Sequence, residues 1–236
     1  MKLLAFETAT EACSVALWLD GEVRERFEIA PRRHAELTLP WADQLLAEAG
    51  VKKSQLDAIA IGRGPGAFTG VRLAIAIGQG IALALDRPMV PVSTLAALAL
   101  QGQGPRVLAA IDARMGEVYA AAFELRSLEQ GNRDAFALDT ERVIHPETVE
   151  LPDDLNGWQG VGTGFAAQEG ALAARLGSRF SAIDTAALPH AADVARLGAL
   201  AFARGEAVAP EFAEPAYLRN NVALTIAEQK ALRDSR

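Results

Sequence analysis

The most chemically suggestive stretch of the sequence is residues 62–70, Gly-Arg-Gly-Pro-Gly-Ala-Phe-Thr-Gly, which follows an apolar run at residues 57–61. Its glycines permit a positive φ or a close backbone approach, while Pro65 fixes one turn. Thr69 is predicted to cap the helix that follows. A glycine-rich loop before a helix can cradle phosphate with its free N–H groups. Because Gly-Lys-Ser/Thr and the GxGxxG spacing are both absent, a tight structural crossover is an equally good interpretation.

Few other residues have the types and spacing that catalysis requires. The three histidines, His34, His145 and His190, lack the i, i+4 spacing that lets two imidazoles reach one ion, so we expect no metal site. Cys13 and Ser14 lie at the start of a predicted strand, with no histidine nearby in the sequence. A buried structural cysteine is the commoner case, so we expect no covalent catalysis.

The helix predicted behind the glycine loop is apolar on almost every side. Only Arg72 and Gln79 interrupt residues 71–85, whereas a surface helix normally carries a polar stripe. It is too short and too interrupted for a membrane span. We therefore predict that one face packs on the chain's own sheet and the other meets a second chain; a wholly intramolecular core helix is the alternative. Small residues recur at every fourth position and allow close approach of another backbone: Gly70, Ala74, Gly78 and Ala82.

Charge and composition limit the classes of function. The chain has 236 residues, half of them apolar, and a net charge of −7, which argues against a stand-alone nucleic-acid-binding protein. A local basic cluster is interpreted as a solvated face, or as support for RNA held mainly by a partner. A single cysteine and the absence of a signal-peptide pattern favour a cytoplasmic protein. The residues of the local basic cluster are Arg24, Arg26, Arg32 and Arg33.

The order of predicted elements indicates two α/β lobes. Strands and helices alternate up to a Gly/Pro-rich linker at residues 101–105. After it, residues 107–114 echo residues 3–8, because each is an apolar strand that ends in an acid and a polar turn. This echo predicts lobes related by duplication, residues 1–103 and residues 104–236. The predicted strands are 3–6, 15–19, 23–29, 57–61, 88–92, 107–114, 118–123 and 158–161, and the predicted helices are 31–49, 69–85, 93–100, 165–176 and 191–204.

Four sequence motifs, in order, resemble those of one protein family. They are residues 4–17, 62–72, 111–119 and 214–221. The family is TsaB, also called YeaZ, a bacterial component of threonylcarbamoyl-adenosine synthesis on tRNA. The similarity spans nearly the whole chain.

The resemblance implies an actin-like ATPase (ASKHA) fold of two lobes. It also implies a non-catalytic scaffold and activator that binds TsaD, the subunit that transfers threonylcarbamoyl to the adenosine beside the anticodon. TsaE joins this assembly, tRNA is reached through the complex, and a homodimer is expected when TsaD is absent. No cofactor is expected for this chain alone, with any ATP or ADP binding belonging to the complex. A stand-alone ATPase or small-molecule kinase is the main alternative, and a peptidase a weaker one.

The family's functional regions map onto two sets of residues. The partner surface corresponds to the helices at residues 31–49 and 69–85. A nucleotide pocket, if one exists, is expected to be vestigial, because no lysine or acidic pair completes a phosphoryl-transfer site. The interface residues are Leu37, Trp41, Leu45, Gly70, Leu73, Ala74, Ile77, Gly78 and Ile81, and the pocket residues are Thr8, Thr10, Arg114, Gly162 and Gly164.

Two acidic positions carry further expectations. The family usually has Asp where this chain has Glu7, which argues further against independent ATP hydrolysis. We interpret Glu7 as an acid exposed at a turn. Arg114 follows Asp112 closely enough to form a structural ion pair instead of binding a ligand.

Overall fold

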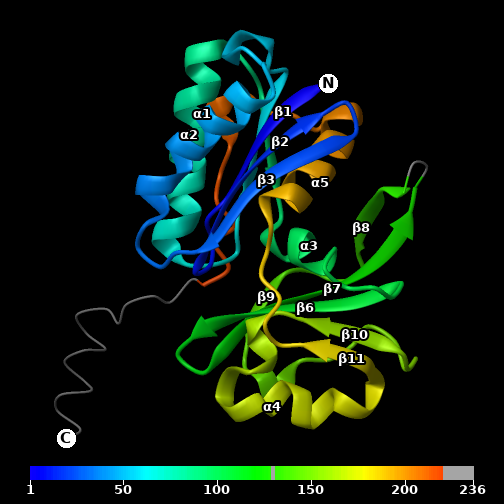
Figure 1. Cartoon of the computed structure of the whole chain (residues 1–236). Coiled ribbons are helices and arrows are strands. Elements are labelled where there is room, and N and C mark those ends of the chain that lie inside the picture. The colour runs from blue at the N-terminus through cyan, green and yellow to red at the C-terminus, as the bar shows by residue number, and fades with distance from the viewer. Residues whose placement is uncertain (129–130, 220–236) are drawn as a thin grey trace, which may run out of the picture.

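Two β-sheets with the same strand topology form the framework of the protein (Figure 1). The computed structural model describes residues 1–128 and 131–219, so Asn220 and Asn221 of the fourth motif lie outside the described residues. In the first sheet, an antiparallel three-stranded unit is followed by two parallel strands, in the order β3-β2-β1-β4-β5. Its strands are β1 (Lys2–Glu7), β2 (Ala12–Leu19), β3 (Glu22–Ile29), β4 (Ala58–Gly62) and β5 (Met89–Val92).

The second sheet repeats this pattern in the order β8-β7-β6-β10-β11, with β9 paired to β7. The strand β6, which corresponds to β1, is the one whose sequence echoes residues 3–8. The repeat fits the two-lobed actin-like fold that we expected. The strands are β6 (Arg106–Arg114), β7 (Glu117–Ser127), β8 (Arg133–Ala137), β9 (Arg142–Ile144), β10 (Trp158–Val161) and β11 (Phe180–Asp184).

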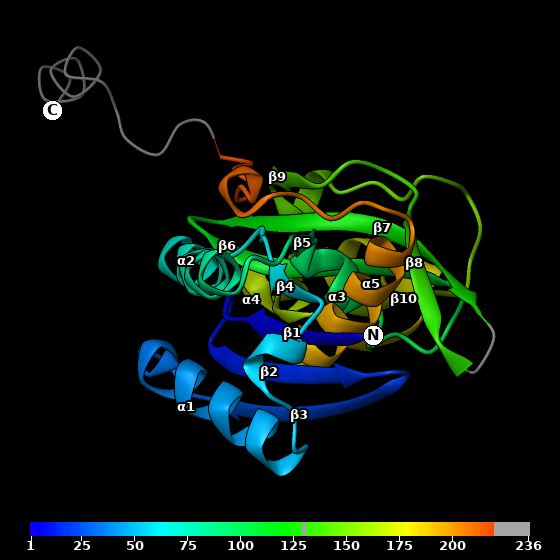
Figure 2. The same ribbon diagram turned by 90° about the horizontal axis from the view of Figure 1, so that it is seen from above.

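Helices form layers on both sides of the first sheet and on the outer face of the second. Because side chains alternate along a strand, Leu4 and Phe6 of β1 pack beneath α1 and α2, whereas Leu3 and Ala5 pack toward α5. Viewed from above, α1 lies over β2 and β3 and α2 lies toward β4 (Figure 2). The helices are α1 (His34–Glu48), α2 (Phe68–Leu85), α3 (Thr94–Ala99), α4 (Ala167–Leu176) and α5 (Ala191–Ala203).

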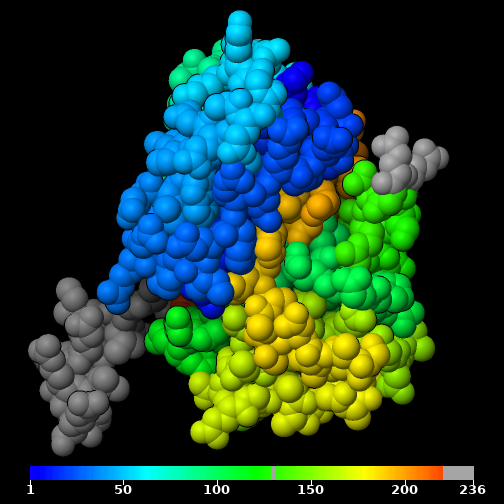
Figure 3. All heavy atoms as spheres, viewed as in Figure 1, coloured from blue at the N-terminus to red at the C-terminus, as the bar shows by residue number. Residues whose placement is uncertain are grey.

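The predicted boundary at residues 103/104 separates the two sheets but not the two lobes. Helix α5 packs on β1, β2 and β4 of the first sheet, although it lies far beyond the boundary in sequence. Gly198 makes this possible, because a Cβ there would stand 2.9 Å from the Cβ of Ala60. Val208 then pairs with Met89 of β5. The first lobe therefore also includes residues from about 190 to 213. Residues of α3 and α5 belong to the hydrophobic core that lies between the two sheets, and Figure 3 shows the orange atoms of this part of the chain between the blue first lobe and the green second lobe.

Helix ends follow local signals in one case and tertiary contacts in another. Ser93 caps α3, the helix predicted at residues 93–100, by accepting a hydrogen bond from the Ala96 N–H at 3.0 Å. The prediction for Thr69 is wrong: the N-cap is Ala67, two residues earlier, and α2 begins at Phe68. The Ala67 N–H donates to the Ala9 carbonyl at 2.7 Å, which holds the start of the helix on the β1–β2 turn. Helix α1 continues through Pro40.

Helix α2 is not buried on every side within this chain. It is the one helix of the described chain with the length and apolar composition to cross a membrane, but one side of it packs in the core. Leu83, on another side, is 66 % exposed. The buried residues are Val71, Ala74, Ile75, Gly78 and Ala82.

Candidate functional site

A cavity of about 570 Å³ lies where segments of both lobes meet. Its walls come from the β1–β2 turn, the glycine loop, the start of α1, the tip of the β6–β7 hairpin and residues 215–219. Of the predicted pocket residues, Thr10 and Arg114 line it. Arg114 is exposed and lies 3.2 Å from the Asp112 carboxylate, so the predicted ion pair between them is present.

Three other predicted pocket residues have structural roles and do not line the cavity. Thr8 is buried and donates its hydroxyl hydrogen bond to the Gly70 carbonyl at 2.7 Å. Gly162 has a φ of +109°, and a Cβ there would overlap the Ala110 carbonyl oxygen. A Cβ on Gly164 would stand 2.7 Å from that of Ala110. These glycines let the turn that follows β10 pack closely on Ala110 of β6, which corrects our assignment of them to a nucleotide pocket.

The glycine loop is a packed crossover between β4 and α2. Its N–H groups at Arg63, Gly64 and Ala67 donate to protein acceptors, so they are not available to a phosphate. A Cβ on Gly66 would stand 2.5 Å from the Ala9 carbonyl oxygen, and one on Gly70 would overlap that of Thr8. The loop's glycines therefore let it lie directly on the β1–β2 turn, the second of the two interpretations left open by the sequence.

Glu7 is buried beneath this loop, so the expectation of an exposed acid is wrong. Its carboxylate accepts hydrogen bonds from the Ala9 N–H at 2.7 Å and the Thr94 hydroxyl at 2.9 Å. Because Gly62 has no side chain, it leaves room for the Glu7 carboxylate. Burial, only partly offset by these hydrogen bonds, raises the pKa of Glu7 to about 7. The carboxylate ties β1 to the loop and to α3, and it does not line the cavity.

The predicted partner surface divides into buried and outward-facing residues. Leu45 and Ala74 are fully buried, and Gly78 packs against Ile61 and Met89, so these three belong to the chain's own core. Gly70 lies against Thr8. This corrects their assignment to an interface: the ridge of small residues serves the close packing of α2 on its own sheet.

The remaining predicted interface residues are partly accessible on the outer sides of the two helices. Sequence reasoning missed Leu83, because every side of α2 is apolar and the pattern could not show which side faces outward. We define the α1–α2 surface as Leu37, Trp41, Leu73, Ile77, Ile81 and Leu83.

The histidines and the cysteine are dispersed in the structure as in the sequence. Within residues 1–128 and 131–219, no three His, Cys, Asp or Glu side chains gather closely enough to hold a metal ion. The His34 ring faces the carbonyls of Thr10 and Ala12, away from the Cys13 thiol, which lies near the Thr38 hydroxyl. Burial raises the pKa of the Cys13 thiol, which makes it a weaker nucleophile.

A C-terminal strap, residues 207–219, connects the two lobes and lines one side of the cavity. Along α2, Gln79 donates to the Pro210 carbonyl at 2.9 Å. The strap then crosses the glycine loop, where the Ala216 N–H donates to the Arg63 carbonyl at 2.8 Å. Arg219 reaches the second lobe, 2.5 Å from the Glu117 carboxylate. Residues 214–219 of the fourth sequence motif thus join the two lobes, a role that is visible only from their contacts with residues distant in the sequence.

A second contact between the lobes involves Glu141, which follows β8. Its carboxylate lies 3.1 Å from the Arg63 guanidinium and also accepts a hydrogen bond from Ser93. Both partners belong to the first lobe, so the glycine loop is held from the second lobe by this carboxylate and by the strap.

Comparisons with known proteins agree with this architecture. Residues 27–227 match the family model of TsaD, tRNA N6-adenosine threonylcarbamoyltransferase. The chain is similar to the tRNA threonylcarbamoyladenosine biosynthesis protein TsaB of Escherichia coli K12, with 46 % identity over 94 % of this chain and 96 % of that protein. The TsaB of Haemophilus influenzae is 39 % identical over 94 % of this chain and 95 % of that protein. The solved structure of YeaZ from Pseudomonas aeruginosa has a TM-score of 0.83 and 48 % identity, covering 92 % of this chain and 99 % of that one. The chain therefore belongs to the TsaB (YeaZ) family.

Proposed function

We propose that this chain is a non-catalytic subunit that binds a TsaD-family protein through the α1–α2 surface and activates it for threonylcarbamoyladenosine synthesis on tRNA. TsaE would join the same assembly, and tRNA would reach this chain through the complex in the cytoplasm. The names of its relatives place them in this pathway.

The observation that carries the proposal is the outward side of α2. Leu83 is 66 % exposed, and Leu73, Ile77 and Ile81 are only half-buried. Apolar surface of this kind on a soluble subunit marks an interaction site. Burying it contributes about 25 cal/mol per Å² before the cost of association is subtracted. The same surface would pair two copies of the chain when no TsaD-family protein is present.

The non-catalytic part of the proposal is supported by groups that are already engaged. The N–H groups of Arg63, Gly64 and Ala67 donate within the protein, and so does the Thr8 hydroxyl. Glu7 is buried away from the cavity. Phosphoryl transfer needs hydrogen-bond donors and a carboxylate that face the nucleotide. The N–H groups, the Thr8 hydroxyl and the Glu7 carboxylate are instead bonded to other groups of the protein.

Co-purification of charge-substituted variants with a TsaD-family partner tests the proposal. Ile77→Glu and Leu83→Glu place a carboxylate on the α1–α2 surface and should reduce recovery of the partner at least tenfold. Leu155→Glu is the matched control, because Leu155 is 49 % exposed in the second lobe. Full recovery with both α2 variants would refute this interface.

The cavity between the lobes favours one alternative, a stand-alone ATPase or small-molecule kinase that uses Thr10 and Arg114. Magnesium-dependent ATP turnover by the purified chain, abolished by Arg114→Ala, would replace the scaffold proposal with this one.

A further inference from the structure

The mouth of the cavity carries an aromatic–arginine cluster at the start of α2. The Arg72 guanidinium lies 3.4 Å from the centroid of the Phe68 ring and 5.4 Å from that of Tyr217, and its Nε donates to the Tyr217 hydroxyl at 2.8 Å. Phe68 is 58 % and Tyr217 56 % exposed. Two rings and a guanidinium plane are thus held in place while more than half of each aromatic residue faces solvent.

The arginines of this region differ in whether a carboxylate pairs with them. In the predicted basic cluster, Arg26 is paired with Glu48 and Arg33 with Glu28. These two pairs agree with the interpretation of the cluster as a solvated face. Arg32 instead lines the cavity, and in the part of the chain that the structure describes neither Arg32 nor Arg72 has a carboxylate within 4.0 Å. Glu11 and Asp112 also line the cavity, and Asp112 is paired with Arg114. Arg32 and Arg72 therefore supply the positive charge that remains for an anionic ligand at this site.

The backbone of the cavity wall has positive φ where these side chains are presented. Arg32, Arg114 and Met115 have φ values of +70°, +63° and +56°, a region unfavourable for residues with a Cβ. All three line the cavity, and Met115 is 77 % exposed. Met115 and Gly116 form the two-residue turn of the β6–β7 hairpin, in which positive φ is the ordinary geometry. These backbone conformations place the three side chains at the cavity wall.

We propose that this cluster, with Arg32, binds an unpaired nucleotide of RNA, its base stacked on Phe68 or Tyr217 and its phosphates beside Arg32 and Arg72. Aromatic rings and arginine planes are the groups on which proteins stack unpaired bases. A free nucleoside triphosphate is the poorer match, because the glycine-loop N–H groups that would cradle its phosphates are already engaged. The inference rests on the proposed function, in which the RNA is the tRNA undergoing modification.

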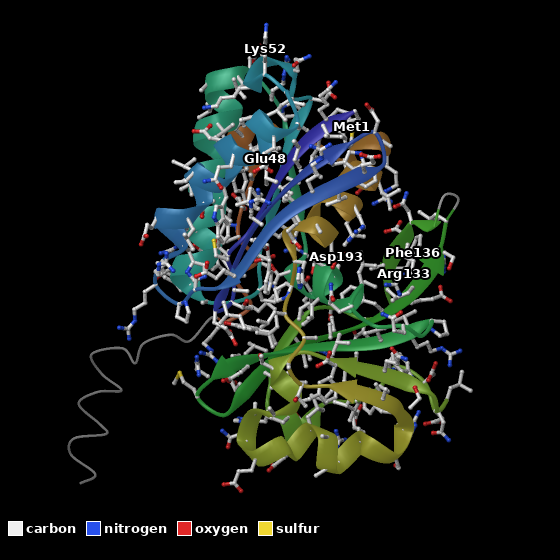
Figure 4. All side chains as sticks on the ribbon, in the orientation of Figure 1. Met1, Glu48, Lys52, Arg133, Phe136 and Asp193 are labelled. Carbon is white, nitrogen blue, oxygen red and sulfur yellow. The ribbon has the colours of Figure 1, made fainter. Side chains whose placement is uncertain are left out.

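The test measures tRNA affinity of the full-length chain assembled with a TsaD-family partner, by fluorescence anisotropy at several salt concentrations. Phe68→Ala and Tyr217→Ala should each weaken tRNA binding about tenfold. Arg32→Ala should reduce the slope of log affinity against log salt by about one. Phe136→Ala is the control, because Phe136 lies on β8 in the other lobe (Figure 4). There the Arg126 guanidinium lies 4.0 Å from the centroid of the Phe136 ring, in a similar pair. It should leave affinity unchanged.

Assembly of the complex is measured in parallel, so that the two proposals fail separately. Normal assembly with weakened tRNA binding supports the RNA site. Normal assembly with unchanged tRNA affinity overturns it, as does loss of assembly in Phe68→Ala, which would make the cluster a protein contact. Displacement of bound tRNA by ATP that requires Phe68 would also overturn it in favour of a free-nucleotide site. If the wild-type chain does not bind the partner at all, the proposed function fails. The RNA site would still be supported in that case if the chain alone binds tRNA and Tyr217→Ala abolishes this binding.

Discussion

The Thr94 hydroxyl donates a hydrogen bond of 2.9 Å to the Glu7 carboxylate, joining the end of β1 to the start of α3. The same hydroxyl accepts from the Gly64 N–H at 3.2 Å, and the Thr94 N–H donates to the Gly64 carbonyl. One buried acid therefore fixes the glycine loop, from which α2 begins. The position of the proposed partner surface depends on this buried network.

The raised pKa of Glu7 predicts a stability that falls as pH rises. With a pKa of about 7 in the folded protein and 4.5 when unfolded, the folded state binds more protons between these values. The free energy of unfolding should therefore decrease from pH 4.5 to 7, by an amount on the order of 3 kcal/mol. Urea titrations at a series of pH values measure it. Glu7→Gln should flatten this part of the profile, and an unchanged profile in that variant would show that another group is responsible.

His190 should lose its favourable charge at higher pH. Burial lowers its pKa, but the hydrogen bond and charge of Glu25, 2.9 Å away, outweigh burial and leave the pKa raised. Stability from this pair is present below pH 6.5 and is lost as pH rises through the folded-state pKa. NMR titration of the His190 ring measures that pKa directly, and Glu25→Gln should lower it.

Two glycines of α2 should respond in opposite ways to alanine. A Cβ at Gly70 would overlap the Thr8 carbonyl, so Gly70→Ala should destabilise the protein by at least about 2 kcal/mol. A Cβ at Gly80 would have nothing within 4 Å, so Gly80→Ala should stabilise by about 0.5–1 kcal/mol through helix propensity. Thermal melts of both variants decide this, and equal melting temperatures would contradict the packing of the loop on the β1–β2 turn.

The C-terminal strap should become more mobile when the contacts of Arg219 with the second lobe are removed. Arg219 lies 2.5 Å from Glu117 and donates to the Ala113 carbonyl at 3.2 Å. Arg219→Ala should speed hydrogen exchange at Ala216, whose N–H bonds to the Arg63 carbonyl. Arg126→Ala removes an exposed ion pair with Glu124 and should leave that exchange rate unchanged. Equal hydrogen-exchange rates at Ala216 in the two variants would show that the Arg219 contacts do not hold the strap in place.

Local patterns predicted much of the fold, whereas tertiary contacts decided the site. The strand at residues 3–6 and the helix at residues 93–100 were predicted from sequence within one residue or so of β1 and α3, because each depends mainly on neighbouring residues. Glu7 was misjudged, because its burial depends on a loop more than fifty residues away in the sequence. Likewise, the docking of α5 on the first sheet leaves no local signal.

The candidate site shows the same division. The apolar composition of α2 predicted that one side meets a partner, and the family resemblance added α1, yet neither showed which side of each helix faces outward. Ala74 therefore proved to be core, while Leu83 proved to be surface. The cavity was anticipated only at Thr10 and Arg114, since its other walls come from segments brought together by the strap.

The central claim is that the α1–α2 surface binds a TsaD-family protein. Light scattering during size exclusion of the chain, alone and mixed with that partner, tests it most directly. We predict a homodimer alone, a heterocomplex with partner, and loss of both in Leu83→Glu. A monomer that does not bind the partner, or a Leu83→Glu variant that still forms the heterocomplex, would contradict the account.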